Sequence, residues 1–264
     1  MQLIDIGINL THESYEADRT AVLARAAAAG VSQMVITGAS MAGTTKAIAL
    51  AAADPRRFAA TAGVHPHHAL ELDAANLSLL TTLAQTPEVA AVGECGLDYF
   101  RNFSPRDSQL AAFESQLALA AQLQKPVFMH LRDASEDFFA LMRTWRPRLL
   151  SAVAHCFTDN LAVARQCLDF DLHIGITGWF CDERRGAHLR DVVRLIPPGR
   201  LMIETDGPYL LPRDLSPNPA SRRNEPAFLP HIAAAIAAAR GESMLEFASH
   251  TTRTARAFFS LPEL

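Results

Sequence analysis

The chain has 264 residues, of which 49% are hydrophobic and 20% are charged, a balance typical of a globular protein rather than a disordered one. Its net charge of -4 excludes a broadly basic surface that grips duplex nucleic acid through many phosphates, so any nucleic-acid contact must be local. No apolar run approaches the roughly 18 to 20 residues of a membrane span, and the start MQLIDIG lacks a secretory pattern, so we expect a cytoplasmic protein without a membrane segment.

Apolar, β-branched runs alternate with Ala- and Leu-rich helical stretches from one end of the sequence to the other. This alternation indicates repeated βα units and a parallel sheet. A helical segment follows each predicted strand, and the strands are predicted at residues 2–8, 31–37, 58–63, 89–93, 126–129, 151–154, 172–176 and 200–204. Eight such units predict an α/β fold, a TIM (β/α)8 barrel that takes up residues 1–264 as a single domain.

Local chemistry predicts several boundaries and connections. Gly30 should end the first Ala-rich helix, and Ser104 followed by Pro105 resembles an N-cap with proline at the first helical position. The Pro-, Ser- and Asn-rich stretch 212–226 is expected to be a functional loop after the eighth strand. In the tail from 248 to 264, Ala255, Phe258 and Phe259 have helical spacing, which favours a closing helix packed on the barrel over a partner-binding helix.

Four of the predicted strands end in a side chain that can bind a metal. Glu94 follows the fourth strand, His130 the fifth, His155 the sixth and Asp206 the eighth. The carboxyl ends of parallel barrel strands open on one face, so we expect these four side chains to converge. Imidazole and carboxylate are common ligands of divalent metals, and the set therefore predicts a metal site. The four cysteines lack C-x-x-C spacing and are expected to be buried thiols.

Asp206 is also our candidate general base. An acid beside a metal-bound water can accept that water's proton. Glu204 could take this role instead, because both residues share a facing in an extended strand. We favour Asp206, since it lies nearer the loop.

Further polar residues are predicted at the mouth of the barrel. His65, in GVHPHH after the third strand, could donate a hydrogen bond to a phosphate or a leaving group, whereas His67 and His68 should be solvated. Arginine guanidinium groups suit phosphate oxygens, and we expect a substrate-binding role for Arg132, Arg222 and Arg223.

Long stretches of the sequence resemble the TatD family of metal-dependent deoxyribonucleases. They are DIGINLT, TAGVHPH, VGECGLDYFRNFS, PVFMHLRDA, HCFT, IGITGWFCDERRG, IETDGPYLLPRDL and SRRNEPAFLPHI, which together cover nearly the whole chain. The resemblance implies a TIM barrel of the metal-dependent hydrolase type. It also implies a divalent-metal-dependent 3′-5′ exonuclease of single-stranded DNA and RNA, a cytoplasmic and monomeric enzyme linked to DNA repair.

The resemblance carries the family's metal ligands onto Glu94, His130 and His155, with Asp206 as the acidic site residue. Its usual His-x-His pair after the first strand falls on Gly7 and Asn9, which predicts a weak second metal or none. Phosphate chemistry and the resemblance favour Mg²⁺, while two imidazoles with a carboxylate also suit Mn²⁺ or Zn²⁺.

Two other functions are consistent with such a barrel. One is a metal-dependent amide or cyclic-amide hydrolase, in which a carbamylated lysine often bridges two ions. Lys46 is predicted on a helix and Lys125 at the wrong end of the fifth strand, which argues against it. The other is a binding protein whose catalysis decayed with the loss of the first-strand histidines, although the remaining candidate ligands are intact.

Overall fold

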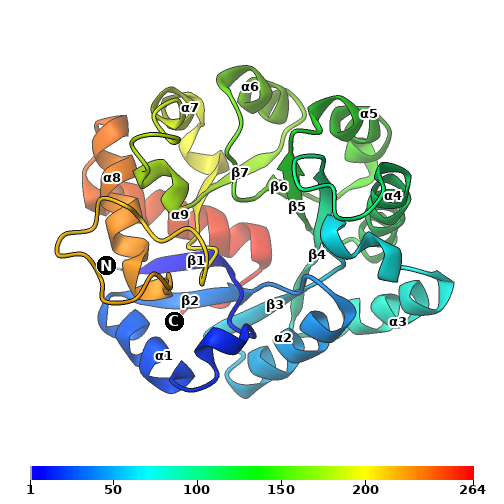
Figure 1. Cartoon of the computed structure of the whole chain (residues 1–264), viewed down its shortest axis with the longest axis horizontal. Helices are drawn as coiled ribbons and strands as arrows, with labels where there is room; N and C mark the ends of the chain where they lie inside the picture. The colour runs from blue at the N-terminus through cyan, green and yellow to red at the C-terminus, as the bar shows by residue number, and fades with distance from the viewer. Residues whose placement is uncertain (1) are drawn as a thin grey trace.

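The computed structural model describes residues 2–264, and within them eight parallel strands form one sheet in chain order from β1 to β8. Helices surround this sheet as a ring (Figure 1). The strands are β1 (Leu3–Ile8), β2 (Val31–Ile36), β3 (Phe58–Ala62), β4 (Val89–Asp98), β5 (Val127–Arg132), β6 (Ala152–Ala154), β7 (His173–Ile176) and β8 (Leu201–Ile203). The predicted TIM barrel is therefore confirmed, and all eight predicted strands are present.

The helices follow the strands as the pattern predicted. They are α1 (Arg19–Ala28), α2 (Met41–Ala53), α3 (Ala74–Ala84), α4 (Arg106–Leu123), α5 (Ser135–Trp145), α6 (Leu161–Asp169), α7 (Leu189–Leu195), α8 (Leu229–Arg240) and α9 (Met244–Phe259). Several loops contain short 3-10 helices, among them η2 (Pro66–Glu71) between β3 and α3 and η4 (Gly178–Cys181) between β7 and α7. In the described part of the chain, none of these helices combines the length and apolar character that crossing a bilayer requires.

Two of the predicted helix boundaries can be compared with the structure. Gly30 follows α1 with a φ of 87°, as expected of a glycine that ends a helix. The prediction for α4 was wrong by one residue, because Pro105 itself occupies the cap position and no side chain caps the helix. Ser104 instead donates its hydroxyl to the carbonyl of His67, which fixes the loop after β3 against the start of α4.

The seam between β1 and β8 is closed by a small set of hydrogen bonds. The amide of Asn9 donates to the carbonyl of Gly207 (2.9 Å), and the amide of Asp206 donates to the carbonyl of Gly7 (2.8 Å). Beside them, the carboxyl group of Asp5 accepts from the amide (2.9 Å) and the hydroxyl (2.5 Å) of Thr205. This seam holds the residues after β8 against those after β1.

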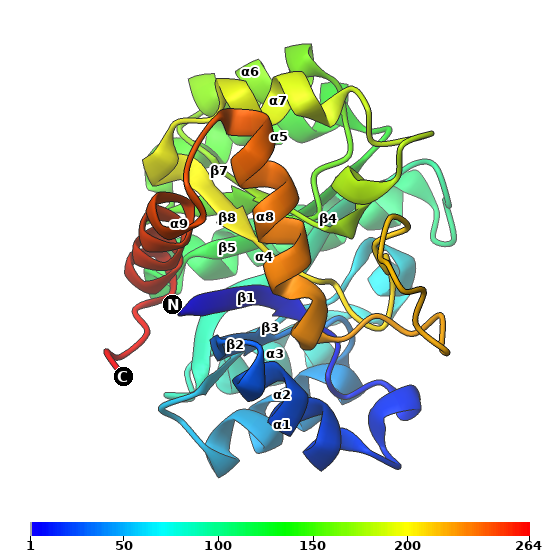
Figure 2. The same cartoon turned by 90° about the vertical axis from the view of Figure 1, so that its left-hand side faces the viewer.

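Helix α9 closes the amino-terminal end of the barrel. Phe258, Phe259 and Ala255 pack with side chains from inside the sheet, including Phe128 and Ile6, to form one buried cluster. The predicted closing helix is thus confirmed. Figure 2 shows α9 on the side opposite the long loop that precedes α8, so that loop lies at the end of the barrel that α9 does not cover.

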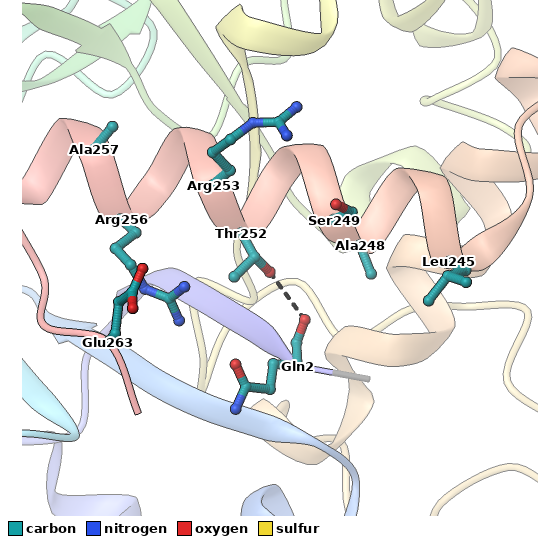
Figure 3. A pocket seen from close by; sticks show the side chains of 9 residues that line it. All are labelled: Gln2, Leu245, Ala248, Ser249, Thr252, Arg253, Arg256, Ala257 and Glu263. Carbon is teal, nitrogen blue, oxygen red and sulfur yellow. Dashed lines mark hydrogen bonds between the residues drawn. The ribbon is translucent and has the colours of Figure 1, made fainter.

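A hollow of about 600 Å³ lies between α9 and the residue before β1 (Figure 3). The hydroxyl of Thr252 donates to the carbonyl of Gln2 there (2.9 Å), and Arg253 and Arg256 border the opening. Because Gln2 precedes β1, this hollow is at the opposite end of the barrel from the predicted metal ligands.

Candidate metal centre

One carboxylate oxygen, Oε1 of Glu94, is the point on which three imidazoles converge. It lies 2.7 Å from Nε2 of His155, 3.2 Å from Nδ1 of His130 and 3.3 Å from Nε2 of His65. These side chains are at most 17% exposed, so they face one another largely shielded from solvent. Ligand atoms of His65, Glu94 and His130 all lie within 4.8 Å of one another. A nitrogen and oxygen donor set this compact and this buried fits a divalent transition metal.

Glu94 and His130 lie inside strands rather than after them, which corrects our prediction. Strand β4 continues to Asp98 and β5 to Arg132, because Gly96 pairs with His130 and Asp98 pairs with Arg132. A side chain on Gly96, whose φ is +133°, would collide with the carbonyl oxygen of His130. Glycine therefore lets β4 approach β5 closely enough to align Glu94 with His130.

The histidines after β3 behave differently from the prediction. His65 lies in the imidazole cluster itself. His67 is not simply solvated, because its Nε2 lies 2.9 Å from Oδ2 of Asp98. The same carboxylate oxygen is 3.4 Å from Nε2 of His130. His68 is half-exposed beside Glu71, as expected of a solvated loop residue.

Asp98 is a site residue that our reading of the sequence missed. It is 1% exposed and holds His67 and His130 together from the end of β4. In an extended strand Glu94 and Asp98, four residues apart, point to the same side. This periodicity would have identified Asp98 if the sequence had shown that β4 continues beyond Gly93.

The electrostatics of the cluster are those of a carboxylate surrounded by imidazoles. Burial raises the pKa of Glu94, but electrostatic interactions with the imidazoles of His65 and His155 and the hydrogen bonds from His130 and His155 hold it well below its usual value. Burial lowers the pKa of His155, yet the carboxylates of Glu94 and Glu204 raise it well above the usual range. Burial lowers the pKa of His65 to about 4, so this imidazole stays neutral and able to act as a ligand.

Glu204 supports the cluster from behind. It is fully buried, and its carboxylate accepts from the amide of Cys156 (2.5 Å) and lies 3.2 Å from Nδ1 of His155. A side chain on Gly7 would collide with Oε2 of Glu204. Glu204, which directly follows β8, thus fills the space that a side chain at position 7 would need.

Asp206 lies in front of this support, in the turn after β8. Its Oδ1 accepts a hydrogen bond from Nδ2 of Asn9 (3.0 Å). Burial raises the pKa of Asp206 to about 8, and the carboxylates of Glu94 and Glu204 also raise it. A carboxyl group with this pKa can exchange a proton near neutral pH, which suits a general base. Asn9, directly after β1, therefore orients the candidate base.

The three candidate arginines have different surroundings. Arg132 lies two residues beyond His130, with its guanidinium carbon 4.2 Å from the ring centre of Phe100 and 5.6 Å from that of Trp179. Arg222 is exposed in the long loop after β8. Arg223 is paired with Asp18 (2.7 and 2.8 Å) and lies over the ring of Tyr15, so its donors already serve the fold.

Comparisons with known proteins agree with this architecture. A family model described as TatD related DNase matches residues 4–260. A protein named 3'-5' ssDNA/RNA exonuclease TatD from Erwinia amylovora is 51% identical over 259 residues, which cover 98% of this chain and 100% of that protein. A protein of the same name from Enterobacter lignolyticus is 52% identical, with 98% of this chain and 99% of that protein covered.

Solved structures resemble the whole barrel. A TatD family hydrolase from Entamoeba histolytica has a TM-score of 0.88 and 28% identity, with 99% of both chains covered. YJJV, a TatD homolog from Escherichia coli K12, has a TM-score of 0.89 and 25% identity, with 98% of both chains covered. The similarity thus extends over all eight βα units.

Proposed function

Because this chain belongs to the TatD related DNase family, we propose that it is a 3′-5′ exonuclease that uses a divalent metal ion to hydrolyse single-stranded DNA and RNA. The observation that supports the metal-dependent chemistry most directly is the convergence of His65, His130 and His155 on one oxygen of Glu94. These four residues would hold the ion, with Asp206 beside them. The ion would act as a Lewis acid on a phosphoryl oxygen and supply hydroxide at neutral pH, for which Mg²⁺ is our first candidate.

Asp206 is proposed as the group that takes the proton of the attacking water. The hydrogen bond from Asn9 fixes the direction of its carboxylate, and a cation held by the neighbouring ligands would favour the ionised form that accepts a proton. Glu204 would remain a support for His155, since its oxygens are already engaged and fully buried. This division of roles keeps one carboxylate free to exchange protons.

Arg132 is proposed to bind the end of the substrate strand together with the two rings that flank it. Phe100 is 56% exposed and Trp179 is half-buried, so the stack of Phe100, Arg132 and Trp179 can receive bases at the mouth. Stacking on aromatic rings and guanidinium planes accepts any base, as a nuclease without sequence preference requires. Exposed Arg222 would contact phosphates further along the strand, with Arg223 anchoring the base of its loop.

We further propose that residues 1–264 act as one catalytic domain, as a monomer in the cytoplasm, and that the enzyme serves DNA repair. An amide hydrolase with a bridging lysine is disfavoured by the position of both lysines. Lys46 is exposed on α2, and Lys125 donates to the carbonyls of Thr86 and Val89 beside the start of β4, at the far end of the barrel.

The test is digestion of single-stranded DNA labelled at either end, with Mg²⁺, Mn²⁺, Zn²⁺ or a chelator. We expect stepwise shortening of 5′-labelled strands and early release of the label from 3′-labelled strands, both abolished by chelator and by Glu94→Ala. His68→Ala, at a half-exposed position, should keep full activity as a matched control. Full activity of folded Glu94→Ala, or release of the 5′ label first, would contradict the proposal.

A further inference from the structure

A second group of metal-donor side chains lies outside the imidazole cluster. It consists of Cys181 at the end of η4, Asp214 in the loop after β8 and His231 in the first turn of α8. Their ligand atoms all lie within 4.8 Å of one another, and Nε2 of His231 is 2.7 Å from Oδ1 of Asp214. We propose that these three residues form a zinc site that fastens the long loop after β8 to the body of the barrel.

The donor types favour zinc over the ion expected at the catalytic centre. A thiolate, an imidazole and a carboxylate are three of the ligands that tetrahedral Zn²⁺ takes in proteins, with water as the fourth. Mg²⁺ is a hard ion and would bind poorly to the sulfur of Cys181. The two sites should therefore differ in metal preference although they share one chain.

The three residues become more exposed from the barrel outward. Cys181 is 6% exposed, whereas the side chains of His231 and Asp214 are 34% and 51% exposed. The sulfur thus forms the floor of the site and the other two ligands its rim. An ion can enter from solvent and keep a water on its open side.

The neighbouring charged groups leave these three donors available. Asp182, next to Cys181, is bound to Arg185 (2.8 Å) and accepts from the amide of Arg184 (3.0 Å), so its carboxylate is committed elsewhere. In the metal-free state burial and Asp214 raise the pKa of the Cys181 thiol to about 12, so the sulfur carries its proton. Zinc binding would form the S–Zn bond as the S–H proton leaves to solvent, and His231 would bind through Nε2 with its proton on Nδ1.

The ligands come from three segments that are separate in sequence. One ion would join η4, the 204–226 loop and α8 at a single point. Trp179 lies two residues before Cys181, and Arg222 lies eight residues after Asp214 on the same loop. Zinc at this point would therefore limit the motion of two side chains that the proposed function places at the substrate strand. This effect on substrate binding rests on the proposed function, whereas the zinc site itself does not.

The experiment is a titration of the full-length protein with Co²⁺, which replaces Zn²⁺ and shows a thiolate-to-metal charge-transfer band. Cys156 follows His155 beside the imidazole cluster, so Cys156→Ser should keep the band if the band reports the second site alone. We expect the band at saturation to correspond to one Co²⁺ ion per chain, Zn²⁺ to displace it, and Glu94→Ala to retain it. Cys181→Ser and His231→Gln should lose it, while Cys167→Ser, at a buried thiol in α6, should keep it. Absence of the band in the wild type, or its survival in Cys181→Ser, would overturn the site.

A second measurement tests the fastening of the loop and guards against a variant that merely misfolds. Trypsin cuts after arginine, and the loop offers Arg213, Arg222 and Arg223. Zn²⁺ should slow cleavage at these positions at least several-fold in the wild type but leave it unchanged in His231→Gln, whose circular dichroism should match the wild type. Equal cleavage rates with and without Zn²⁺ in the wild type would refute the fastening.

Discussion

At the scale of single residues, the carboxylate of Glu204 leaves room only for glycine at position 7. Any side chain at position 7 would collide with Glu204, which is fully buried and bonded to His155 and Cys156. The imidazole of His155 is therefore held in place by a fully buried carboxylate.

We expect Gly7→Ala to lower the free energy of unfolding by about 1 to 3 kcal/mol, because the extra methyl group overpacks a closed site. Displacing Glu204 should also lower kcat by about tenfold or more through His155. Urea unfolding and kcat with a labelled oligonucleotide measure both effects. Gly199→Ala is the control, since nothing lies within 4 Å of the added carbon. A Gly7→Ala enzyme with wild-type stability would show that Glu204 can move freely.

Asp98 is the second residue that acts through its neighbours, because it touches both His67 and His130. Asp98→Asn keeps the shape and removes the charge, so we expect metal affinity and kcat to fall about 10- to 100-fold with little change in KM. Calorimetric metal titration and steady-state kinetics separate the two quantities. The control is Asp191→Asn, whose side chain is 72% exposed on α7. If Asp98→Asn raised KM alone, Asp98 would contact the substrate instead.

At the scale of elements, the contact between β7 and α9 should make the fold sensitive to acid. His173 begins β7, and its ring meets the ring of Phe258 edge-on, with centroids 4.9 Å apart. Burial lowers the pKa of His173 from 6.5 to about 4. In the unfolded chain this imidazole takes up a proton at higher pH than in the folded one.

The contribution of neutral His173 to the free energy of unfolding should thus be fully present above pH 6.5. It should be lost as the pH falls from 6.5 toward 4, and the loss should be at most about 3 kcal/mol. Urea unfolding at a series of pH values measures this slope. We expect His173→Leu to flatten it, while His68→Leu, at a half-exposed position, leaves it unchanged. An unchanged slope in His173→Leu would assign the acid sensitivity to other groups.

At the scale of the whole molecule, the sequence predicted the architecture better than the details of the site. Strand periodicity and the alternation with helices were sufficient for eight βα units, because each unit is encoded locally. The ends of β4 and β5 could not be predicted in this way. Gly93 and Gly96 signal a turn locally, whereas pairing with β5 continues strand β4 through both glycines. Such pairing depends on a neighbour about 35 residues away and leaves no local pattern.

The same distinction applies to the residues of the site. Glu94, His130 and His155 were predicted together because the pattern placed each of them after one of three consecutive strands, and the structure brings them into contact. His65 and His67 were assigned to phosphate and solvent because loop direction cannot be read from a strand pattern. The turn at Pro66 carries His65 into the cluster and His67 onto Asp98.

The seam between the first and last strands also has a consequence for heat inactivation. Asp206 is anchored on that seam, where backbone bonds to Gly7 and from Asn9 to Gly207 join the two edges of the sheet. Gentle warming that opens this seam would displace Asp206, the proposed proton acceptor, while the buried cluster beneath α9 stays packed. Turnover should therefore fail at a lower temperature than the one at which the barrel melts, and cooling should restore it.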